Sequence, residues 1–389
     1  MTVAGDPESP GRGTRAADTA IRAVRARVYV VPTTFDGEPM NESDGTAKWD
    51  STTVLVVEID AGGCTGLGYA YTSSTGLGLV RDVLAPLVTG KDATATPQLF
   101  WAMARAVRNI GWRGIAASAI SAMDVALHDL KAKLLDVSLF RLLGASRDRI
   151  MVYGSGGFTS YSDEQLRQQL GGWAEQGIRA VKMKIGTDAA ADPARVRTAR
   201  EAIGGDVQLF VDANGAYSRK QALGMAEQFW ADDRVTWFEE PVSSDDLEGL
   251  RLMRDRGPGG MQIAAGEYGY MPADFRLLLT SGAVDTLQAD ATRCGGVTGF
   301  LNAVEQCVAW GVPLSAHCAP ALHAVLTASV EPGVHVEYFH DHALIEPLLF
   351  DGTPELVDGC LVPDPSRAGL GLELTDRGDE YRTESWAWD

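Results

Sequence analysis

Residues 181–241 read VKMKIGTDAAADPARVRTAREAIGGDVQLFVDANGAYSRKQALGMAEQFWADDRVTWFEEP and alternate short apolar runs with helical stretches. The apolar runs predict three strands, at Val181–Ile185, Val207–Val211 and Thr236–Phe238. A helix N-cap and first helical residue, Asp192-Pro193, follow the first strand, and a helix is expected to open at Ser218 after the second. Strict alternation of strands and helices is typical of a parallel sheet.

The alternation continues toward the C-terminus. Further strands are expected at Met261–Ala265, Thr286–Ala289 and Pro313–Ser315, with a last strand ending near Ile345. Helices are expected to open near Ser244, Ala273, Val297 and Pro320. This many strand–helix units predict an α/β fold that closes into a TIM-type (β/α) barrel over residues 151–350.

The chain ahead of the barrel has a mixed pattern. Ile21–Pro32 and Thr53–Ile59 predict strands, and the polar segment Thr33–Asp50 between them is interpreted as a flexible loop. From Pro97 onward the pattern is helical, with one apolar face made by Ile120, Met123, Leu127, Leu130 and Leu134. Residues 21–150 are therefore expected to form an α+β domain. Asp124 and His128 lie one turn apart on its long helix, where we expect a structural role.

Composition excludes several classes of protein. The net charge of -18 argues against a nucleic-acid partner, which needs a basic surface, and no apolar run is long enough to cross a bilayer. Five scattered cysteines form no C-x-x-C pair, so neither a zinc ribbon nor a disulfide framework is indicated, and a cytoplasmic location fits. Residues 1–20 lack the apolar region of a signal peptide and are interpreted as a disordered leader.

Ionisable residues recur at or just beyond the ends of the expected barrel strands. By subtraction their separations are 28, 27, 28, 23, 27 and 29 residues, about one strand–helix unit each, along the series Lys184, Asp212, Glu239, Glu267, Asp290, His317 and Glu346. The carboxyl ends of parallel barrel strands surround one mouth. We therefore expect the seven side chains to converge on one site.

Three of these residues, Asp212, Glu239 and Glu267, are carboxylates from consecutive strands. Like charges in one pocket repel unless a cation neutralises them, and hard oxygen ligands suit Mg²⁺. Lys182 and Lys184 are two residues apart in a strand and so point to the same face. Placed side by side, they are expected to lower each other's pKa, which would let Lys184 act as a base near neutral pH.

His317 is expected to pair with Asp290, which lies at the end of the preceding strand. A neighbouring carboxylate fixes the tautomer of an imidazole and raises its basicity. This pairing favours a catalytic role for His317 over that of a satisfied core histidine.

The chain after about residue 20 resembles the enolase superfamily, and within it the mandelate racemase subgroup of the mandelate racemase / muconate lactonizing enzyme family. The resemblance is carried by Val181-Lys-Met-Lys184, Asp212-Ala-Asn214, Phe238-Glu-Glu-Pro241, Ala265-Gly-Glu267, Asp290-Ala-Thr-Arg-Cys-Gly-Gly296, Ser315-Ala-His317 and Ile345-Glu-Pro347. A muconate-lactonizing enzyme would have lysine on the strand that here ends in Asp290, and a glucarate dehydratase would have asparagine at Glu267.

The resemblance implies a modified barrel capped by residues from both chain ends, with residues 351–389 returning to the cap. It implies Mg²⁺ at Asp212, Glu239 and Glu267, and a proton taken from the carbon beside a carboxylate by Lys184, with Lys182 in support. His317, oriented by Asp290, would serve the opposite face, and Glu346 would hydrogen-bond the substrate carboxylate. A small-molecule carboxylate substrate and a homo-oligomeric assembly are further implications.

The reaction after proton removal stays open. Loss of a β-hydroxyl would make the protein an acid-sugar dehydratase, the outcome we favour by analogy, whereas reprotonation would make it a racemase or epimerase. Substrate contacts are expected from the 33–50 loop, from Tyr71–Thr75 and from Asn214, Lys182, Glu346 and His340. His340 and His342 are interpreted as surface histidines beside the pocket rather than as a second metal site.

Other classes of function are less well supported by the sequence. A non-catalytic barrel that acts as a binding protein would be expected to have lost Lys184 or Glu267, and both are present. No G-x-S-x-G motif of a serine hydrolase and no P-loop occurs.

Overall fold

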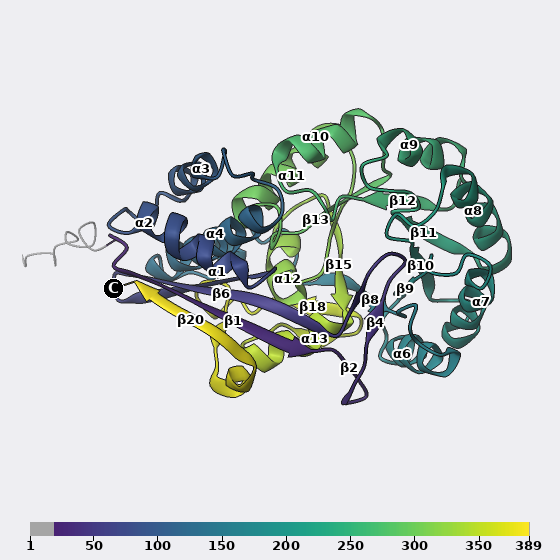
Figure 1. The fold of residues 1–389 in the computed structure, drawn as a ribbon, viewed down its shortest axis with the longest axis horizontal. Coiled ribbons are helices and arrows are strands. Elements are labelled where there is room, and N and C mark those ends of the chain that lie inside the picture. The colour runs from purple at the N-terminus through teal and green to yellow at the C-terminus, as the bar shows by residue number, and fades with distance from the viewer. Residues whose placement is uncertain (1–18, 389) are drawn as a thin grey trace, which may run out of the picture.

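A closed barrel of eight parallel strands dominates the computed structural model, which describes residues 19–388 (Figure 1). The strands pair in chain order, and the last pairs with the first through the register Phe339↔Ser155. They are β8 (Ile150–Gly156), β9 (Ala180–Lys184), β10 (Gln208–Asp212), β11 (Val235–Glu239), β12 (Gln262–Ala265), β13 (Thr286–Ala289), β14 (Leu314–Ala316) and β15 (Gly333–Phe339). The predicted fold class is confirmed.

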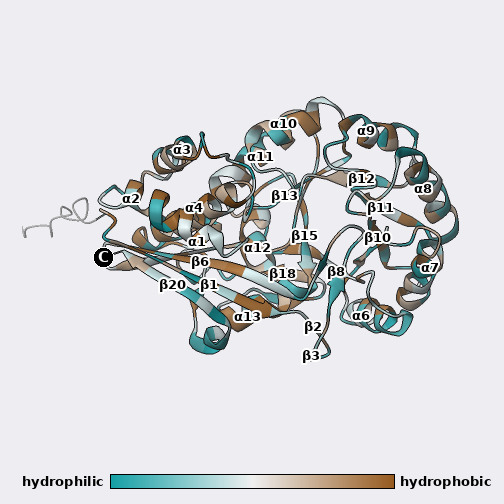
Figure 2. Ribbon diagram, in the orientation of Figure 1, coloured by the Kyte–Doolittle hydropathy of each residue, from teal (hydrophilic) through white to brown (hydrophobic). Residues whose placement is uncertain are grey.

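Helices of mixed polarity surround the barrel (Figure 2). Their apolar side chains join those of the strands in one large core. The helices are α6 (Asp163–Glu175), α7 (Asp192–Ile203), α8 (Arg219–Asp233), α9 (Leu247–Arg256), α10 (Pro272–Thr280), α11 (Gly296–Trp310), α12 (Pro320–Ala328) and α13 (His340–Leu349). Ser218 caps α8 as expected, through a capping box with Gln221. Asp192 is the first residue of α7 rather than its N-cap, because its carboxylate accepts hydrogen bonds from the Gly186 amide and Tyr217.

The end of the last barrel strand was predicted incorrectly. β15 ends at Phe339, and residues up to Leu349 form α13, so Ile345 lies inside a helix. No glycine or proline separates Val334 from Ile345, so local sequence does not mark the boundary. The strand ends where its pairing with β8 ends, which is a tertiary constraint.

The second layer of the molecule is a four-stranded antiparallel sheet in the order β20-β1-β6-β7, formed by β1 (Ala23–Pro32), β6 (Ser51–Ala61), β7 (Cys64–Tyr71) and the C-terminal β20 (Arg382–Trp388). Helix α4 (Ile115–Leu134) packs across β7. The approach is close because Gly68 has no side chain, and a Cβ there would lie 2.1 Å from the Ala122 carbonyl oxygen. Asp124 and His128 of α4 both bind Thr298 of α11, so they join this cap to the barrel.

The remaining elements are short. The cap contains α1 (Thr75–Leu79), a π-helical turn η1 (Val80–Leu84), α2 (Ala85–Val88) and α3 (Thr96–Ala106). Between the cap and the end of the chain lie α5 (Leu139–Leu142), β16 (Phe350–Asp351), β17 (Glu355–Val357), β18 (Cys360–Val362), β19 (Glu373–Leu374) and the 3-10 helix η2 (Asp376–Tyr381). β18 pairs with β8, so part of the C-terminal segment also extends the barrel sheet.

Residues 33–50 are ordered, contrary to the flexible loop that was expected. They form two small hairpins, β2 (Thr34–Phe35) with β3 (Glu38–Pro39) and β4 (Glu42–Ser43) with β5 (Lys48–Trp49), and they reach from the cap toward the barrel (Figure 1). Ser43 Oγ lies 2.7 Å from Thr159 Oγ1, and Thr187 Oγ1 donates to the Asp44 carbonyl at 2.7 Å. These contacts to the loops after β8 and β9 supply the order that the sequence pattern does not show.

None of the helices in residues 19–388 is both long and apolar enough to cross a membrane. Most of the leader expected at residues 1–20 lies outside the described residues.

Candidate active site

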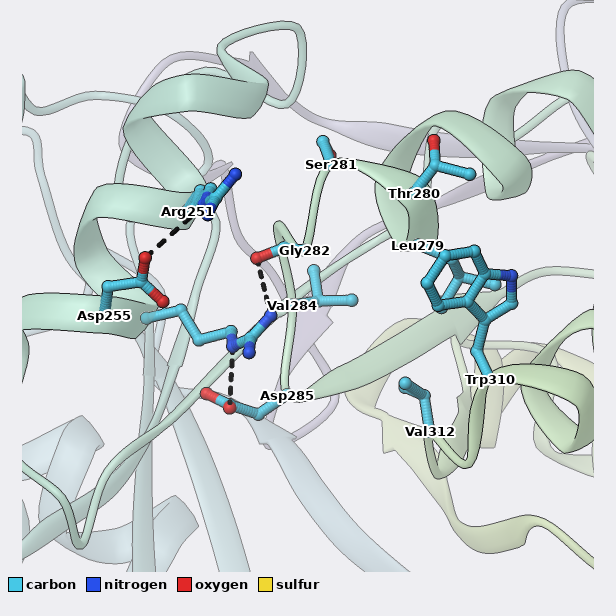
Figure 3. Close-up of a pocket in the computed structure, with 11 residues that line it drawn as sticks. Arg251, Asp255, Leu279, Thr280, Ser281, Gly282, Val284, Asp285, Trp310 and Val312 are labelled. Carbon is cyan, nitrogen blue, oxygen red and sulfur yellow. Dashed lines mark hydrogen bonds and ion pairs between the residues drawn. The ribbon is translucent and has the colours of Figure 1, made fainter.

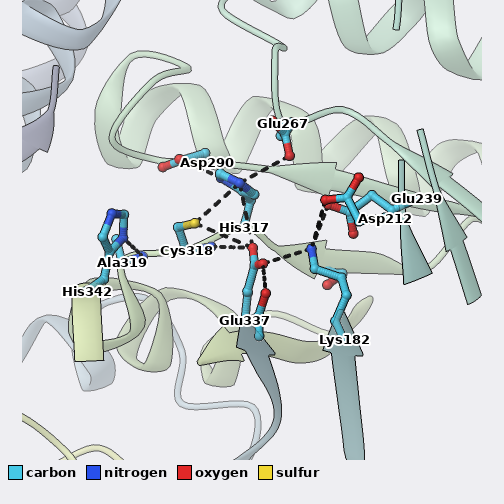
Figure 4. Close-up of polar contacts among 12 residues, drawn as sticks. Lys182, Asp212, Glu239, Glu267, Asp290, His317, Cys318, Ala319, Glu337 and His342 are labelled. Atoms are coloured by element: carbon cyan, nitrogen blue, oxygen red, sulfur yellow. Dashed lines mark hydrogen bonds and ion pairs between the residues drawn. The ribbon is translucent and has the colours of Figure 1, made fainter. Parts of the chain in front are cut away.

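Five members of the predicted series lie together at one end of the barrel, namely Asp212, Glu239, Glu267, Asp290 and His317 (Figure 4). Glu346 lies instead within helix α13. Strand pairing places Lys184, Asp212 and Glu239 side by side at the carboxyl ends of β9, β10 and β11. Beneath them the barrel interior is filled by Tyr153, Phe210 and Trp237, which exclude water from the floor of the site. Charges at this level therefore interact strongly with one another.

Three carboxylates form the metal-binding candidate that the sequence predicted. Asp212, Glu239 and Glu267 each place a carboxylate oxygen within 4.8 Å of the other two, and all three are buried. Burial and the charge of Asp212 raise the pKa of Glu239 to about 8, although the Lys182 amine opposes the rise. An all-oxygen donor set of this charge suits Mg²⁺.

Lys182 and Lys184 point into the barrel as expected, but the predicted lowering of their pKa is wrong for this arrangement. Lys182 Nζ lies 2.6 Å from Glu239 and 2.8 Å from Glu337, and Lys184 Nζ lies 2.5 Å from Asp212. Burial and Lys182 each lower the pKa of Lys184, but the Asp212 carboxylate outweighs them and holds it above its ordinary value. The neighbouring carboxylates therefore determine that the pKa of each lysine is raised rather than lowered.

His317 and Asp290 form the predicted pair. His317 Nδ1 donates to Asp290 Oδ2 at 2.9 Å, and Thr292 donates to the other oxygen through both its amide and its hydroxyl. The second nitrogen, Nε2, lies 3.2 Å from Glu267. Burial alone would lower the pKa of His317, but Cys318, Glu267 and Glu337 hold it well above its usual range.

Glu337 is a site residue that the sequence reasoning missed. It lies on β15, is fully buried, and bridges the two halves of the site, with Oε1 bonded to Lys182 and Ser155 and Oε2 to the Cys318 amide. Burial would raise its pKa, but Lys182 and His317 hold the pKa of Glu337 below its usual range. Alternation along a strand places Glu337 on the same face as His335, but it does not show where the strand ends.

Glu346 does not take the position predicted for the final-strand acid. It lies in the middle of α13, where Oε1 accepts from Tyr69 at 2.6 Å and Oε2 accepts from the Ala321 amide at 2.8 Å. Because Tyr69 belongs to β7 of the cap, this carboxyl group joins the cap to the barrel. The prediction failed because it rested on the misplaced end of the last strand.

The other predicted substrate contacts lie at the edge of this cluster. Asn214 follows β10 in the left-handed conformation, and its backbone N–H donates to Asp212. His340 lies outside the cluster of ionisable residues at the barrel mouth, with its Nε2 donating to the Thr34 carbonyl at 2.9 Å. His342 is nearer to the site and is buried, contrary to the expectation of a surface residue; it stacks on Tyr71 and accepts from the Ala319 amide.

A separate pocket of about 430 Å³ lies at the opposite end of the barrel (Figure 3). Val284 and Val312, which precede β13 and β14, line it together with Trp310. Arg254 spans the pocket, donating to the Gly282 carbonyl and lying 3.6 Å from Asp285. None of the predicted site residues lines this pocket.

Two family models cover most of the chain. The N-terminal domain of mandelate racemase / muconate lactonizing enzyme matches residues 25–144, and the enolase C-terminal domain-like model matches residues 165–378. The chain belongs to the mandelate racemase / muconate lactonizing enzyme family. The family resemblance stated from sequence motifs, and with it membership of the enolase superfamily, is confirmed.

Solved structures and characterised relatives agree with this membership. A mandelate racemase/muconate lactonizing enzyme-like protein from Rubrobacter xylanophilus is 50% identical with a TM-score of 0.90, and the match covers 94% of this chain and 100% of that one. L-Talarate dehydratase from a Polaromonas species, solved with Mg and L-glucarate, is 32% identical with a TM-score of 0.85, covering 96% and 99%. L-Talarate/galactarate dehydratase from Salmonella typhimurium is 32% identical over 84% of this chain and 82% of its own length.

Other relatives include dehydratases named for arabinonate, L-rhamnonate and D-gluconate, cycloisomerases named for 3,6-anhydro-α-L-galactonate and D-galactarolactone, and a hydrophobic dipeptide epimerase. Relatives have been solved with bound magnesium. Asp212, Glu239 and Glu267 form a buried acidic cluster in this chain that suits the magnesium ion bound in those relatives.

Proposed function

We propose that this protein dehydrates an acid sugar by removing the proton from the carbon next to the substrate carboxylate. The observation that carries the proposal is the placement of an amine, Lys184, and an imidazole, His317, beside one cluster of three buried carboxylates. The named dehydratases among the relatives support this reaction over the alternatives.

The two bases take different roles in this proposal. Lys184 removes the α-proton, and the electron pair left on that carbon moves toward the carboxylate. His317 gives a proton from Nε2 to the β-hydroxyl, which leaves as water, while Asp290 holds Nδ1 and so fixes the orientation of the ring. The enol product then tautomerises to a 2-keto-3-deoxy acid, so that the net change is the loss of one water.

Asp212, Glu239 and Glu267 would hold Mg²⁺, which neutralises negative charge that develops on the substrate carboxylate. Lys182 supplies a second, permanently buried positive charge. We assign to Glu337 the role first given to Glu346, that of an acid bonding to the substrate carboxylate, because Glu337 lies between Lys182 and His317. Asn214, whose buried Oδ1 has no hydrogen-bond partner in the described structure, is a further candidate contact.

Racemisation or epimerisation is the second candidate, because bases on two sides of the substrate carbon also allow reprotonation from the opposite face. An epimerase among the relatives supports it. A non-catalytic binding function has less support, because every side chain needed for proton transfer is present and converges on one site.

The two reactions are separated by incubating the protein with Mg²⁺ in D₂O and a panel of mono- and diacid sugars, mandelate-like acids and N-acyl amino acids. Proton NMR of a 2-keto-3-deoxy product establishes dehydration. Deuterium at the α-carbon with inversion and no loss of water establishes racemisation or epimerisation. Failure of the entire panel to exchange or dehydrate would contradict both.

We also propose a cytoplasmic homo-oligomer. Cys294, Cys307 and Cys318 are free and buried, in keeping with a reducing compartment, and Trp101 and Ile110 on the cap surface are 42% and 67% exposed. Light scattering coupled to size-exclusion chromatography measures the number of subunits, and a single-subunit mass would contradict the assembly.

A further inference from the structure

A second group of metal-ligand side chains lies outside the catalytic cluster, where the hairpins of residues 33–50 meet α13. Glu42, His340 and Asp341 each place one ligand atom within 4.8 Å of the others. Glu42 comes from β4 of the cap, and the two other residues are the first two of α13. The group therefore joins two segments about 300 residues apart in the chain.

The two carboxylates are buried and only half satisfied. Glu42 Oε1 accepts from Tyr161 at 3.0 Å, and Asp341 Oδ2 accepts from Trp49 and Thr52 at 3.3 and 3.2 Å. The remaining oxygens, Glu42 Oε2 and Asp341 Oδ1, are buried and have no hydrogen-bond partner in the described structure. Glu42 is 1% exposed and Asp341 4%.

Within residues 19–388, the groups that act most strongly on the Glu42 carboxyl are Asp341, Tyr161 and Trp49, and none of them is a lysine or arginine. Two buried carboxylates with bare oxygens are unfavourable unless a cation or a shared proton stands between them. A bound cation and a proton shared by the two carboxylates are therefore the alternatives for this site.

His340 favours a metal ion. Its Nε2 contacts the carbonyl oxygen of Thr34, and since a carbonyl can only accept, Nε2 carries the proton and Nδ1 keeps its lone pair. A histidine whose second nitrogen donates to a backbone carbonyl is the usual arrangement of a metal ligand. Two carboxylates with one imidazole suit a transition metal such as Zn²⁺ better than Mg²⁺, which prefers oxygen ligands alone.

We propose that Glu42, His340 and Asp341 bind a Zn²⁺-like divalent ion that clamps the 33–50 hairpins onto the barrel. Zinc bonds of about 2.0–2.2 Å span ligands up to roughly 4 Å apart, so the three side chains need to close by less than about 1 Å. His340 is half-buried beside a surface groove, which gives the ion a route inward. The clamp is separate from the reaction proposed above and does not depend on it.

Equilibrium dialysis of the full chain against Zn²⁺, followed by metal analysis, tests the proposal. The wild-type protein is expected to hold two equivalents, one at each cluster. Glu42→Gln and His340→Gln should each weaken the second site by ~100-fold or more, since even the loss of a supporting hydrogen bond weakens metal sites 10- to 100-fold. Glu239→Gln should lose the catalytic equivalent and keep this one.

Asp36→Asn is the matched control, because Asp36 is an exposed acid on the same hairpins and should leave both equivalents in place. Thermal unfolding checks that each variant folds. If Glu42→Gln does not fold, His340→Gln, at a half-buried position, tests the site in its place. Equal Zn²⁺ binding by the wild type and the His340→Gln variant would overturn the proposal and leave a shared proton as the explanation.

Hydrogen–deuterium exchange gives a readout independent of stoichiometry. Zn²⁺ should slow amide exchange in residues 33–50 of the wild-type protein and of Glu239→Gln, but not of His340→Gln. Exchange in this segment that does not respond to Zn²⁺ in the wild-type protein would overturn the clamp.

Discussion

At the scale of single residues, the two lysines of β9 have different environments. Lys182 is completely buried and is held between Glu239 and Glu337. Lys184 is nearer the mouth, with one close carboxylate partner, Asp212. A cation bound to Asp212 would compete for the charge that now raises the pKa of Lys184. Lys184 is therefore the lysine suited to take a proton, and Lys182 the one suited to hold a fixed charge.

Substitution of either base should affect one direction of proton exchange. Lys184→Ala and His317→Asn are each expected to lower α-deuterium incorporation on one face of the substrate by ~10²- to 10⁴-fold, the usual contribution of a general base. NMR in D₂O measures both directions, with Lys220→Ala on the exposed face of α8 as the control. Unchanged exchange in both variants would refute the assignment.

The reassignment from Glu346 to Glu337 is tested by a matched pair of amide variants. Glu337→Gln should lower kcat/KM by ~10²-fold or more, because Lys182 and His317 lose their common charged partner. Glu346→Gln should leave kcat/KM within a few fold, since its contacts are to Tyr69 and the Ala321 amide. Steady-state kinetics measure both values of kcat/KM. A larger loss in Glu346→Gln than in Glu337→Gln would return the proposed role to Glu346.

Glu346 should make stability depend on pH. Burial raises the pKa of Glu346 to about 8, although the hydrogen bond from Tyr69 opposes this. Between the ordinary glutamate pKa of 4.5 and about 8, the unfolded chain has lost a proton that the folded protein keeps, so this group makes stability fall as pH rises, by up to ~1.4 kcal/mol per unit. In urea unfolding, the wild type should lose stability relative to Glu346→Gln from pH 5 to 8; a constant difference would contradict this.

At the scale of elements, the contact between α4 and β7 depends on residues too small to separate them. A Cβ at Gly66 would lie 2.2 Å from the Ala126 carbonyl oxygen, and a Cβ at Gly68 would lie 2.1 Å from the Ala122 carbonyl oxygen. The helix therefore lies directly on the strand, and the side chains of α4, Asp124 and His128 among them, reach α11 of the barrel. The position of the cap over the active site is set by this packing.

Gly68→Ala should destabilise the protein by about 1–3 kcal/mol, because α4 must shift to accept the added methyl group. Gly78→Ala is the control: no atom lies within 4 Å of the added Cβ, and alanine favours the helix in which Gly78 lies. Thermal unfolding should show a lower Tm for Gly68→Ala alone. Equal Tm values for the two variants would show that the close approach has no energetic importance.

At the scale of the whole molecule, the structure around the site brings together segments that are far apart in the sequence. The barrel supplies the side chains that we propose as catalytic, the hairpins of residues 33–50 contact the loops after β8 and β9, and β20 returns from the C-terminus to pair with β1. Anything that binds the folded site and not the unfolded chain stabilises the whole.

Magnesium should therefore stabilise the protein against unfolding. At 100 times its dissociation constant, Mg²⁺ is expected to add about 2.7 kcal/mol, and chelation with EDTA should remove this along with activity. Calorimetry with and without Mg²⁺ measures the change. Asp212→Asn should lose most of the stabilisation, and an unaltered response in that variant would place the ion elsewhere.

Much of the fold and site could be read from local patterns. The six strand ends from Lys184 to His317 were predicted because each strand is short and apolar with a polar residue at or just after its end, and because parallel strands bring those ends to one mouth. The position of Glu337 could not be read in this way, because β15 runs into α13 without a break in the pattern. The order of the 33–50 hairpins was also unreadable, since their partners are distant in the chain.

The sequence by itself determined the barrel, the three carboxylates and the two bases, because hydrophobic period and residue type are local properties. Tertiary structure alone decided the direction of the pKa shift of Lys184 and which glutamate of the last strand region lies at the site. The pKa of Lys184 rises because Asp212 lies 2.5 Å away, a distance that only the pairing of β9 with β10 creates. Likewise, Glu337 rather than Glu346 faces the site because the closure of β15 onto β8 determines where the last strand ends.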